Sequence, residues 1–485
     1  MRNLPILSIL FVLLFTACSK DSEEGALYNF GNGDASGDVY NQITENPFIK
    51  VADSAISTFS IDADGGSYLN SIRYLQEGNM PPADAIRSEE FVNFFKYTPL
   101  VNFNGHPIAV NGEMGQCPWN TQNSIIMLKM SGKDFEKAAL PASNFTFLVD
   151  VSGSMSSADK LPLIIKGLGY LVDNMKPTDK VSIVTYAGRN EIVLQPTACS
   201  DKQTIKNKLK SLTSGGGTNG ADGIKTAYDL ISKNFEKGAN NRVILCSDGD
   251  FNIGISSQAE LIKLIEEKRE TGVYLTTVGV GHGNLNDANM EQIANNGNGN
   301  YEYIANEEDA EYIFNQNFKK FFTVAQDIKV QIEFNPNIVE EYRLIGYENR
   351  VLNASDFEND TKDAGDLSVN QTVIAMYEIV PNKSILNKKE PAFTFKVRYK
   401  NLGETASNEL LFELDNPNTA FQSTSADFQF ASGVSAFAQR MRKGSFIGET
   451  DYKTIYTWIE NAQLSAASSQ KLQLLEMVNK AKSLD

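Results

Sequence analysis

Short apolar segments alternate with amphipathic ones between residues 144 and 322, and this alternation constrains the fold more than any other feature of the chain. Apolar runs such as 145–151 and 242–247 have the length of buried strands, whereas 160–175 repeats apolar residues at helical spacing. Strands that alternate with helices predict a doubly wound α/β domain with a largely parallel sheet. Ligands of such sheets bind at the carboxyl ends of the strands, so the functional residues are expected there.

The segments on either side of this region are richer in β patterns. Strand-like runs at 107–114 and 124–130 precede it, and further runs follow it at 328–334, 342–347, 372–379 and 392–399. Because strands from both sides could form one sandwich, we expect the α/β domain to be an insertion whose last helix spans 308–322. The C-terminal stretches 427–442 and 451–483 are predicted to be helical, with one apolar stripe that packs on the β-rich region.

At 485 residues the chain is too long for one ordinary hydrophobic core, so several domains are expected. We predict a signal peptide at 1–18, a flexible tether at 19–46, an N-terminal region of helices and strands at 47–143, the α/β domain at 144–323, and a β-rich, then helical region at 324–485. The formal net charge of −16 repels phosphate backbones and makes nucleic acid a poor partner.

The N-terminus has the pattern of an export signal. Arg2 precedes an apolar run that is too short to span a bilayer, and the run ends in Phe15-Thr16-Ala17-Cys18. This ending resembles the lipobox of bacterial lipoproteins, which implies that Cys18 carries lipid and anchors the chain to the outer membrane. The acidic segment 19–24 is either a surface-export signal or a solvated tether, so both the periplasmic and the surface face stay open.

The remaining cysteines are Cys117, Cys199 and Cys246, an odd number for an oxidising compartment. No disulfide framework is implied. Cys246 lies in an apolar strand pattern and is expected to be a buried thiol, while a bridge between Cys117 and Cys199 is possible.

Oxygen-bearing side chains gather at the predicted strand ends. Asp150, Ser152 and Ser154 follow the first strand of the α/β domain at alternate positions. Thr218 lies in a glycine-rich loop that opens a helix, and Asp248 ends a second apolar strand. Because Mg²⁺ prefers oxygen ligands and retains several waters, one carboxylate with neutral hydroxyls suits this ion.

These five residues resemble the metal-ion-dependent adhesion site of von Willebrand factor type A domains, with its Asp-x-Ser-x-Ser motif, loop Thr and strand-end Asp. The resemblance implies a Rossmann-like fold and a bound Mg²⁺, Mn²⁺ or Ca²⁺ held by Asp150, Ser152, Ser154, Thr218 and Asp248. Asp250 is set aside as a turn residue. Segments such as 57–62, 88–95 and 346–350 also resemble the YfbK-like bacterial lipoproteins, whose regions flank the type A domain.

Catalytic patterns are scarce, so we predict a binding protein and not an enzyme. The chain has only two histidines, His106 and His282, and it lacks a Gly-x-Ser-x-Gly elbow and a His-Glu-x-x-His helix. The expected partner is a protein that offers an Asp or Glu carboxylate to the metal, giving adhesion or a scaffold in the cell envelope. The alternatives are a metal-dependent hydrolase and a subunit that works with an ATPase complex.

Overall fold

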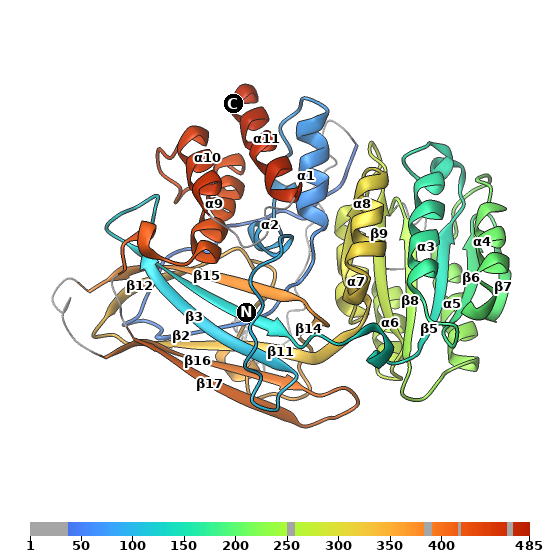
Figure 1. The fold of residues 1–485 in the computed structure, drawn as a ribbon, viewed down its shortest axis with the longest axis horizontal. Helices are drawn as coiled ribbons and strands as arrows, with labels where there is room; N and C mark the ends of the chain where they lie inside the picture. Colours follow the sequence, from blue (N-terminus) through green and yellow to red (C-terminus); the bar gives the residue numbers. More distant parts are fainter. Residues whose placement is uncertain (1–36, 250–257, 383–389, 416–418, 463–468) are drawn as a thin grey trace, which may run out of the picture.

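The computed structural model describes residues 37–249, 258–382, 390–415, 419–462 and 469–485. A six-stranded sheet in the order β10-β9-β8-β5-β6-β7 forms the α/β body on the right of Figure 1. Its strands are β5 (Ser143–Asp150), β6 (Lys180–Tyr186), β7 (Asn190–Ala198), β8 (Asn240–Ser247), β9 (Tyr274–Val280) and β10 (Tyr301–Ile304). All neighbours pair in parallel except β6 and β7.

Helices cover this sheet in two rows. Neighbours α3 (Leu161–Asn174), α4 (Lys202–Lys210) and α8 (Glu307–Glu311) form one row, and α5 (Gly220–Lys233), α6 (Gln258–Arg269) and α7 (Asp287–Asn296) form the other. Every residue of β5 and β8 is buried, as expected for central parallel strands that are covered on both faces. The predicted doubly wound, largely parallel α/β fold is confirmed.

Two antiparallel sheets lie beside the α/β body, in the orders β1-β12-β15-β4-β3 and β13-β2-β11-β16-β17. The strands that precede the α/β body are β1 (Ile49–Lys50), β2 (Ile56–Ser60), β3 (Ile108–Gln116) and β4 (Ser124–Gly132). Those that follow are β11 (Thr323–Phe334), β12 (Val339–Ile345), β13 (Val351–Leu352), β14 (Gly365–Ser368), β15 (Thr372–Pro381), β16 (Pro391–Lys400) and β17 (Ser407–Asp415). Each sheet therefore mixes strands from both sides, and the α/β body is an insertion, as predicted.

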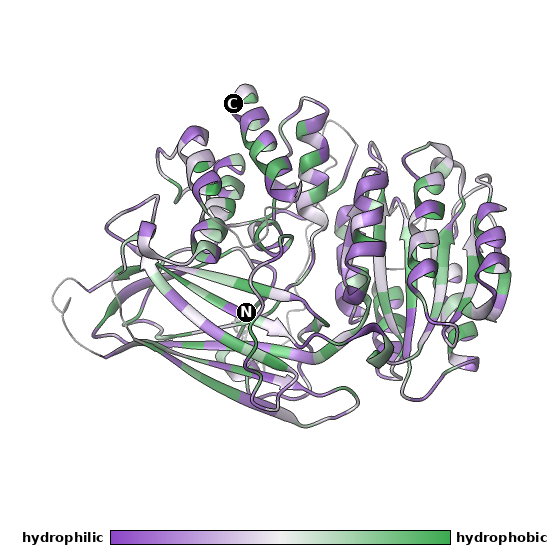
Figure 2. Ribbon diagram, in the orientation of Figure 1, coloured by the Kyte–Doolittle hydropathy of each residue, from purple (hydrophilic) through white to green (hydrophobic). Residues whose placement is uncertain are grey.

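A layer of helices closes the molecule (Figure 1, top). It contains α1 (Gly66–Gln76), α2 (Ser88–Asn93), α9 (Ala426–Met441), α10 (Tyr452–Asn461) and α11 (Ser469–Leu484). Helix α9 packs against α2 and α10, and α11 packs against α1, so the C-terminal helices are covered by the chain itself. Figure 2 shows the hydrophobic residues gathered on the strands and on the inward faces of the helices. Among the described residues, no helix is long and apolar enough to cross a membrane.

Three local expectations differ from the structure. The helix expected at 308–322 is α8 followed by a π-helical turn (Tyr312–Gln316) and a 3₁₀ turn (Phe318–Phe321). The π turn places the Phe314 ring against α3 at Gly167, where an added Cβ would lie 2.7 Å from the ring. Strand β17 was not anticipated. Cys117, Cys199 and Cys246 are all buried free thiols, so no Cys117–Cys199 bridge forms.

The expected tether is also shorter at its C-terminal end, because residues 37–46 pack on the fold. Asp38 is buried, pairs with Arg73 at 2.9 Å and accepts a hydrogen bond from the Leu285 amide at 2.9 Å. Val39 forms an isolated parallel bridge with Asn286. This segment therefore links α1 to the loop that precedes α7, directly beside the candidate site.

Candidate metal site

The site begins at the carboxyl end of β5. The pairing of β5 with β8 brings the two aspartates together. Val149 is paired with Cys246 in the parallel β5–β8 ladder, so Asp150 and Asp248 emerge side by side at the carboxyl edge of the sheet. Both carboxyl groups are buried. The site therefore lies where parallel sheets bind their ligands.

Asp150 is held in place by hydrogen bonds to both carboxylate oxygens. Its Oδ1 accepts from the Ser152 amide at 2.8 Å, and its Oδ2 accepts from Ser247 Oγ at 3.0 Å. Burial raises the pKa of this carboxyl, while the Ser152 hydrogen bonds oppose the rise and the nearby Asp248 charge adds to it. A buried carboxylate of this kind gains stability when a cation binds to it.

The two serine hydroxyls are adjacent and differ in exposure. Ser152 Oγ lies 3.0 Å from Ser154 Oγ, in a tight turn that follows β5. Ser152 is buried whereas Ser154 is exposed, so the hydroxyl pair leads from the Asp150 carboxylate to the surface. The turn thus supplies neutral oxygen donors and one open side.

The loop that carries Thr218 packs on this turn through its backbone. The Gly153 amide donates to the Gly216 carbonyl at 3.1 Å, and the Gly215 amide donates to the Val151 carbonyl at 2.8 Å. Gly216 has a φ of +88°, a conformation that favours glycine. These contacts hold the loop that carries Thr218, a half-buried residue two positions before α5, against the turn that carries the two serines.

Asp248 contacts a cation and an amide that the sequence did not indicate. Its Oδ2 accepts from Lys160 Nζ at 3.1 Å and from Asn284 Nδ2 at 3.0 Å. Lys160 Nζ also donates to Asn284 Oδ1 at 2.6 Å, and the lysine side chain is almost wholly buried. Much of the Asp248 charge is therefore balanced by the protein before any metal binds.

The structure thus gathers Asp150, Ser152, Ser154 and Asp248 at one edge of the sheet, with the Thr218 loop packed beside them. The residues missed from sequence are Ser247, Lys160 and Asn284. Only Ser247 carried a signal, since it ends β8 immediately before Asp248. His282 is exposed and lies 3.2 Å from Asp159 Oδ2. Asp250 and Cys18 lie outside the described residues.

The donor set fits a hard divalent cation. A buried carboxylate, adjacent hydroxyls and a second carboxylate are all oxygen donors, and a set with so little net charge suits Mg²⁺ or Mn²⁺ that keeps some of its water. Asp150, Ser152 and Ser154 would hold the ion, with Thr218 and Asp248 beside it. Such an ion supplies Lewis acidity toward a further oxygen ligand.

Family models match three parts of the chain. Residues 144–316 match "von Willebrand factor type A domain", residues 34–127 match "von Willebrand factor", and residues 319–484 match "Uncharacterized protein YfbK, C-terminal". Together with the fold, these matches define a von Willebrand factor type A domain protein. The chain is 36% identical over 467 residues to the uncharacterized protein YfbK of Escherichia coli (strain K12), covering 91% of this chain and 80% of that protein. It belongs to the YfbK family.

Other matches are more distant. The inter-alpha-trypsin inhibitor heavy chain H2 of Mus musculus is 23% identical over 204 residues, which is 40% of this chain and 21% of that protein. A solved von Willebrand factor type A protein from Catenulispora acidiphila is 13% identical, with a TM-score of 0.43 over 70% of this chain and 80% of that one. The family models and the named sequence relatives indicate no catalytic family.

Proposed function

We propose that this protein is an exported lipoprotein that binds a protein partner through a divalent metal at the Asp150 site. The observation that carries the proposal is the charge of the site. Asp150 is one buried carboxylate among hydroxyls, and the second acid, Asp248, already receives hydrogen bonds from Lys160 and Asn284. A divalent ion held here is under-neutralised, so it attracts a further anionic oxygen ligand.

The chemistry of that ligand follows from the open side of the site. Ser154 is exposed at the surface, so an incoming group reaches the ion from outside the protein. An Asp or Glu carboxylate of a partner supplies the missing negative charge and replaces a bound water. Charge-assisted contacts of this type are among the stronger polar interactions. Mg²⁺ is the proposed ion, with Mn²⁺ and Ca²⁺ as substitutes.

The proposed location is the outer membrane, where lipid on Cys18 anchors the chain on its periplasmic or outer face. Substituting Cys18→Ser removes the acylated thiol. Metabolic labelling with a fatty acid analogue should then fall to background, and equal incorporation into the variant would show that Cys18 is not lipidated.

Binding is tested with the soluble chain that starts after Cys18, immobilised and exposed to envelope proteins. Capture should require Mg²⁺, be reversed by EDTA, and disappear when the envelope carboxyl groups are first converted to amides. Asp150→Ala should abolish it. Asp173→Ala is the matched control, because it removes an exposed carboxylate of α3 that pairs with Lys206 away from the site. Capture that survives carboxyl amidation, or that Asp150→Ala leaves unchanged, contradicts the proposal.

A further inference from the structure

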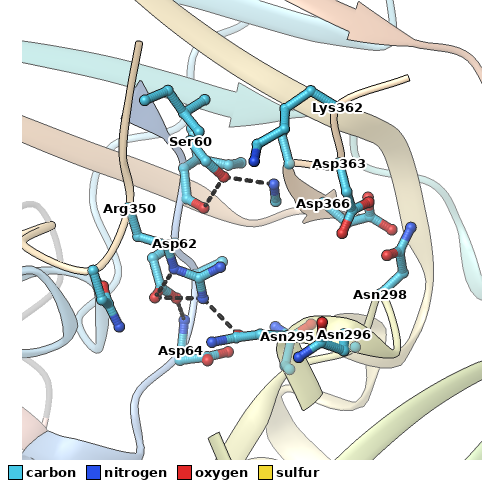
Figure 3. A pocket seen from close by; sticks show the side chains of 18 of the residues that line it. Ser60, Asp62, Asp64, Asn295, Asn296, Asn298, Arg350, Lys362, Asp363 and Asp366 are labelled. Carbon is cyan, nitrogen blue, oxygen red and sulfur yellow. Dashed lines mark hydrogen bonds and ion pairs between the residues drawn. The ribbon is translucent and has the colours of Figure 1, made fainter. Parts of the chain in front are cut away.

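A polar cavity of about 300 Å³ lies between the α/β body and the neighbouring β sheet, away from the metal site. It is bounded by the end of β2 and the residues after it, by the end of α7 and the loop to β10, and by the segments 349–352 and 362–366. Figure 3 shows Asp62, Asp64 and Arg350 on one side of this space and Asp363, Asp366 and Asn298 on the other. Four segments that are distant in the sequence thus meet around one cavity.

Carboxyl groups outnumber basic groups on the walls. Five carboxyl side chains line the cavity but only two basic ones, Arg350 and Lys362. Two of the carboxylates are neutralised by arginine: Arg350 Nη2 lies 2.8 Å from Asp62 Oδ2, and Arg269 Nη1 lies 2.6 Å from Asp363 Oδ2. The remaining acids of the walls are Asp64, Glu266 and Asp366.

Two of those remaining acids have an oxygen without a donor. Asp64 is only 3% exposed; its Oδ1 accepts from the Tyr301 amide at 2.9 Å, but its buried Oδ2 has no hydrogen-bond partner. On the opposite wall, Asp366 Oδ1 accepts from the Asp327 amide at 3.2 Å while its buried Oδ2 is likewise unpartnered. A buried acceptor without a donor costs free energy, so each oxygen favours a ligand that donates.

The nearby guanidinium group donates its hydrogen bonds to other residues. The Arg242 guanidinium is the buried cation that attracts Asp366, yet it donates to Thr276 and Thr323. Burial raises the pKa of both Asp64 and Asp366 well above the usual value, and the like charges of Asp62 and Asp327 add to the rise. Asn298 Oδ1 is a third unpartnered acceptor among the lining residues, and Asn300 Nδ2 is an unpartnered donor. The walls therefore present acceptors on both sides.

The spacing of these acceptors decides between a metal ion and an organic cation. A directly coordinated ion needs its oxygens within about 2.6 Å of one point, and so close to one another. Among the described residues, the only acidic trio whose ligand atoms lie within 4.8 Å of one another is Asp62, Glu90 and Glu291. Asp64 and Asp366 form no such group, because the cavity separates them. Two separated carboxyl oxygens match a ligand with two separated ammonium groups.

We propose that this cavity binds a small organic polycation of the diamine or polyamine class. One ammonium group donates to Asp64 Oδ2 and a second donates to Asp366 Oδ2, while Asn298 Oδ1 accepts from either. The methylene chain between them lies along the apolar part of the wall, which Ile61, Ala63 and Ala364 provide. An ammonium group has three donors and no acceptor, so it satisfies carboxylates without leaving donors of its own unpaired in an acceptor-rich site.

The test is calorimetric titration of spermidine and putrescine into the soluble chain, with Mg²⁺ present at saturation so that the Asp150 site does not contribute. Asp64→Asn and Asp366→Asn should each weaken spermidine binding at least about tenfold, as expected for loss of one charged hydrogen bond. Glu409→Gln, which removes an exposed charge of β17, is the matched control. Because the lost oxygens make no hydrogen bond, both asparagine variants should stay folded, with thermal midpoints at or above that of the parent.

Two further measurements test the proposal, a comparison of propylamine with putrescine and the proton release on binding. Propylamine, with one ammonium group, should bind more weakly than putrescine by at least about tenfold, because it reaches only one wall. Spermidine binding should release protons, seen as an enthalpy that depends on the buffer, since burial raises the pKa of both carboxyls and a bound ammonium group lowers it. Equal spermidine affinity in the parent and both variants, or Ca²⁺ that displaces spermidine at equimolar concentration, would overturn the proposal.

Discussion

Lys160 Nζ lies 3.1 Å from Asp248 Oδ2, and both side chains are buried at the edge of the central sheet. Asn284 bonds to both residues and fixes their geometry. A positively charged side chain beside a metal site lowers the affinity of the site for the metal ion, because like charges repel strongly where water is excluded. In the proposed function, the same lysine would share the charge of Asp248 and keep a bound ion electrophilic toward a partner.

Removing the charge of Lys160 should therefore change metal affinity and partner binding in opposite directions. Lys160→Gln keeps a donor for Asp248 and should tighten Mg²⁺ binding by about tenfold, which is about 1.4 kcal/mol. Capture of carboxylate partners should weaken at saturating Mg²⁺. Lys166→Gln is the control, since this lysine of α3 is exposed and pairs with Glu307. Calorimetry on the three proteins gives the Mg²⁺ affinities, and unchanged affinity in Lys160→Gln would rule out the opposing role of the lysine.

We expect removal of a charged candidate ligand to lower the Mg²⁺ affinity more than removal of a neutral one. Asp150→Ala removes the buried carboxylate and should lower Mg²⁺ affinity by about a hundredfold or more, or about 3 kcal/mol. Ser152→Ala and Ser154→Ala should each cost about tenfold at most, because water replaces a neutral oxygen. Ser156→Ala, an exposed serine of the same turn, serves as the control. A serine variant that binds Mg²⁺ more weakly than Asp150→Ala would contradict this order.

The sequence indicated Asp150 and Asp248 as candidate ligands because each follows an apolar strand, and strand register alone brings Asp150 beside Asp248. Lys160 and Asn284 carried no comparable signal, since they reach Asp248 from distant loops whose position depends on the folded chain. Residues 37–46 were missed for the same reason: Asp38 reads as a solvated acid until Arg73 is placed opposite it. Strand β17 was overlooked although Leu410, Phe412 and Leu414 alternate along it.

A pH dependence of stability is expected from Asp309 in α8. The side chain is nearly buried and accepts a hydrogen bond from the Ala305 amide at 3.0 Å; burial raises its pKa from 3.8 to about 6. Between these values the folded protein holds a proton that the unfolded chain has released. Its contribution to the free energy of unfolding therefore falls by about 3 kcal/mol as the pH rises from about 4 to about 6.

Denaturant titrations of the parent and Asp309→Asn at several pH values check this sign. Asparagine does not titrate, so the stability difference, parent minus variant, should decrease as the pH rises through that window. Asp201→Asn should show the opposite trend, a stability difference that increases as the pH rises, because the Thr204 hydrogen bonds lower the pKa of Asp201. A parent-minus-variant difference at Asp309 that is constant from pH 4 to pH 7 would contradict the prediction.

The last prediction concerns Arg87, which joins the N-terminal region to the α/β body. Its buried guanidinium contacts Glu90 in α2, and it lies 2.7 Å from Asp287 Oδ2 and 3.5 Å from Glu291 Oε2 in α7. Removing one partner of a buried ion pair leaves uncompensated charge, so Arg87→Met should lower the free energy of unfolding by about 3–5 kcal/mol. Lys166→Met, which breaks an exposed pair with Glu307, should leave the free energy of unfolding nearly unchanged, because water screens the pair.

The pH dependence of the Arg87→Met effect identifies its cause. Burial raises the pKa of Glu90 to about 8 and raises that of Glu291 as well, and without the arginine both carboxyls hold protons more readily. The loss of stability should therefore be larger at pH 8 than at pH 5, because protonation removes the unpaired charges at the lower pH. Hydrogen exchange should quicken first in α7, whose preceding residue Asn286 donates its amide to the Asp248 carbonyl at 3.0 Å. A loss in Arg87→Met that is equal at both pH values would mean that packing and not charge holds the two regions together.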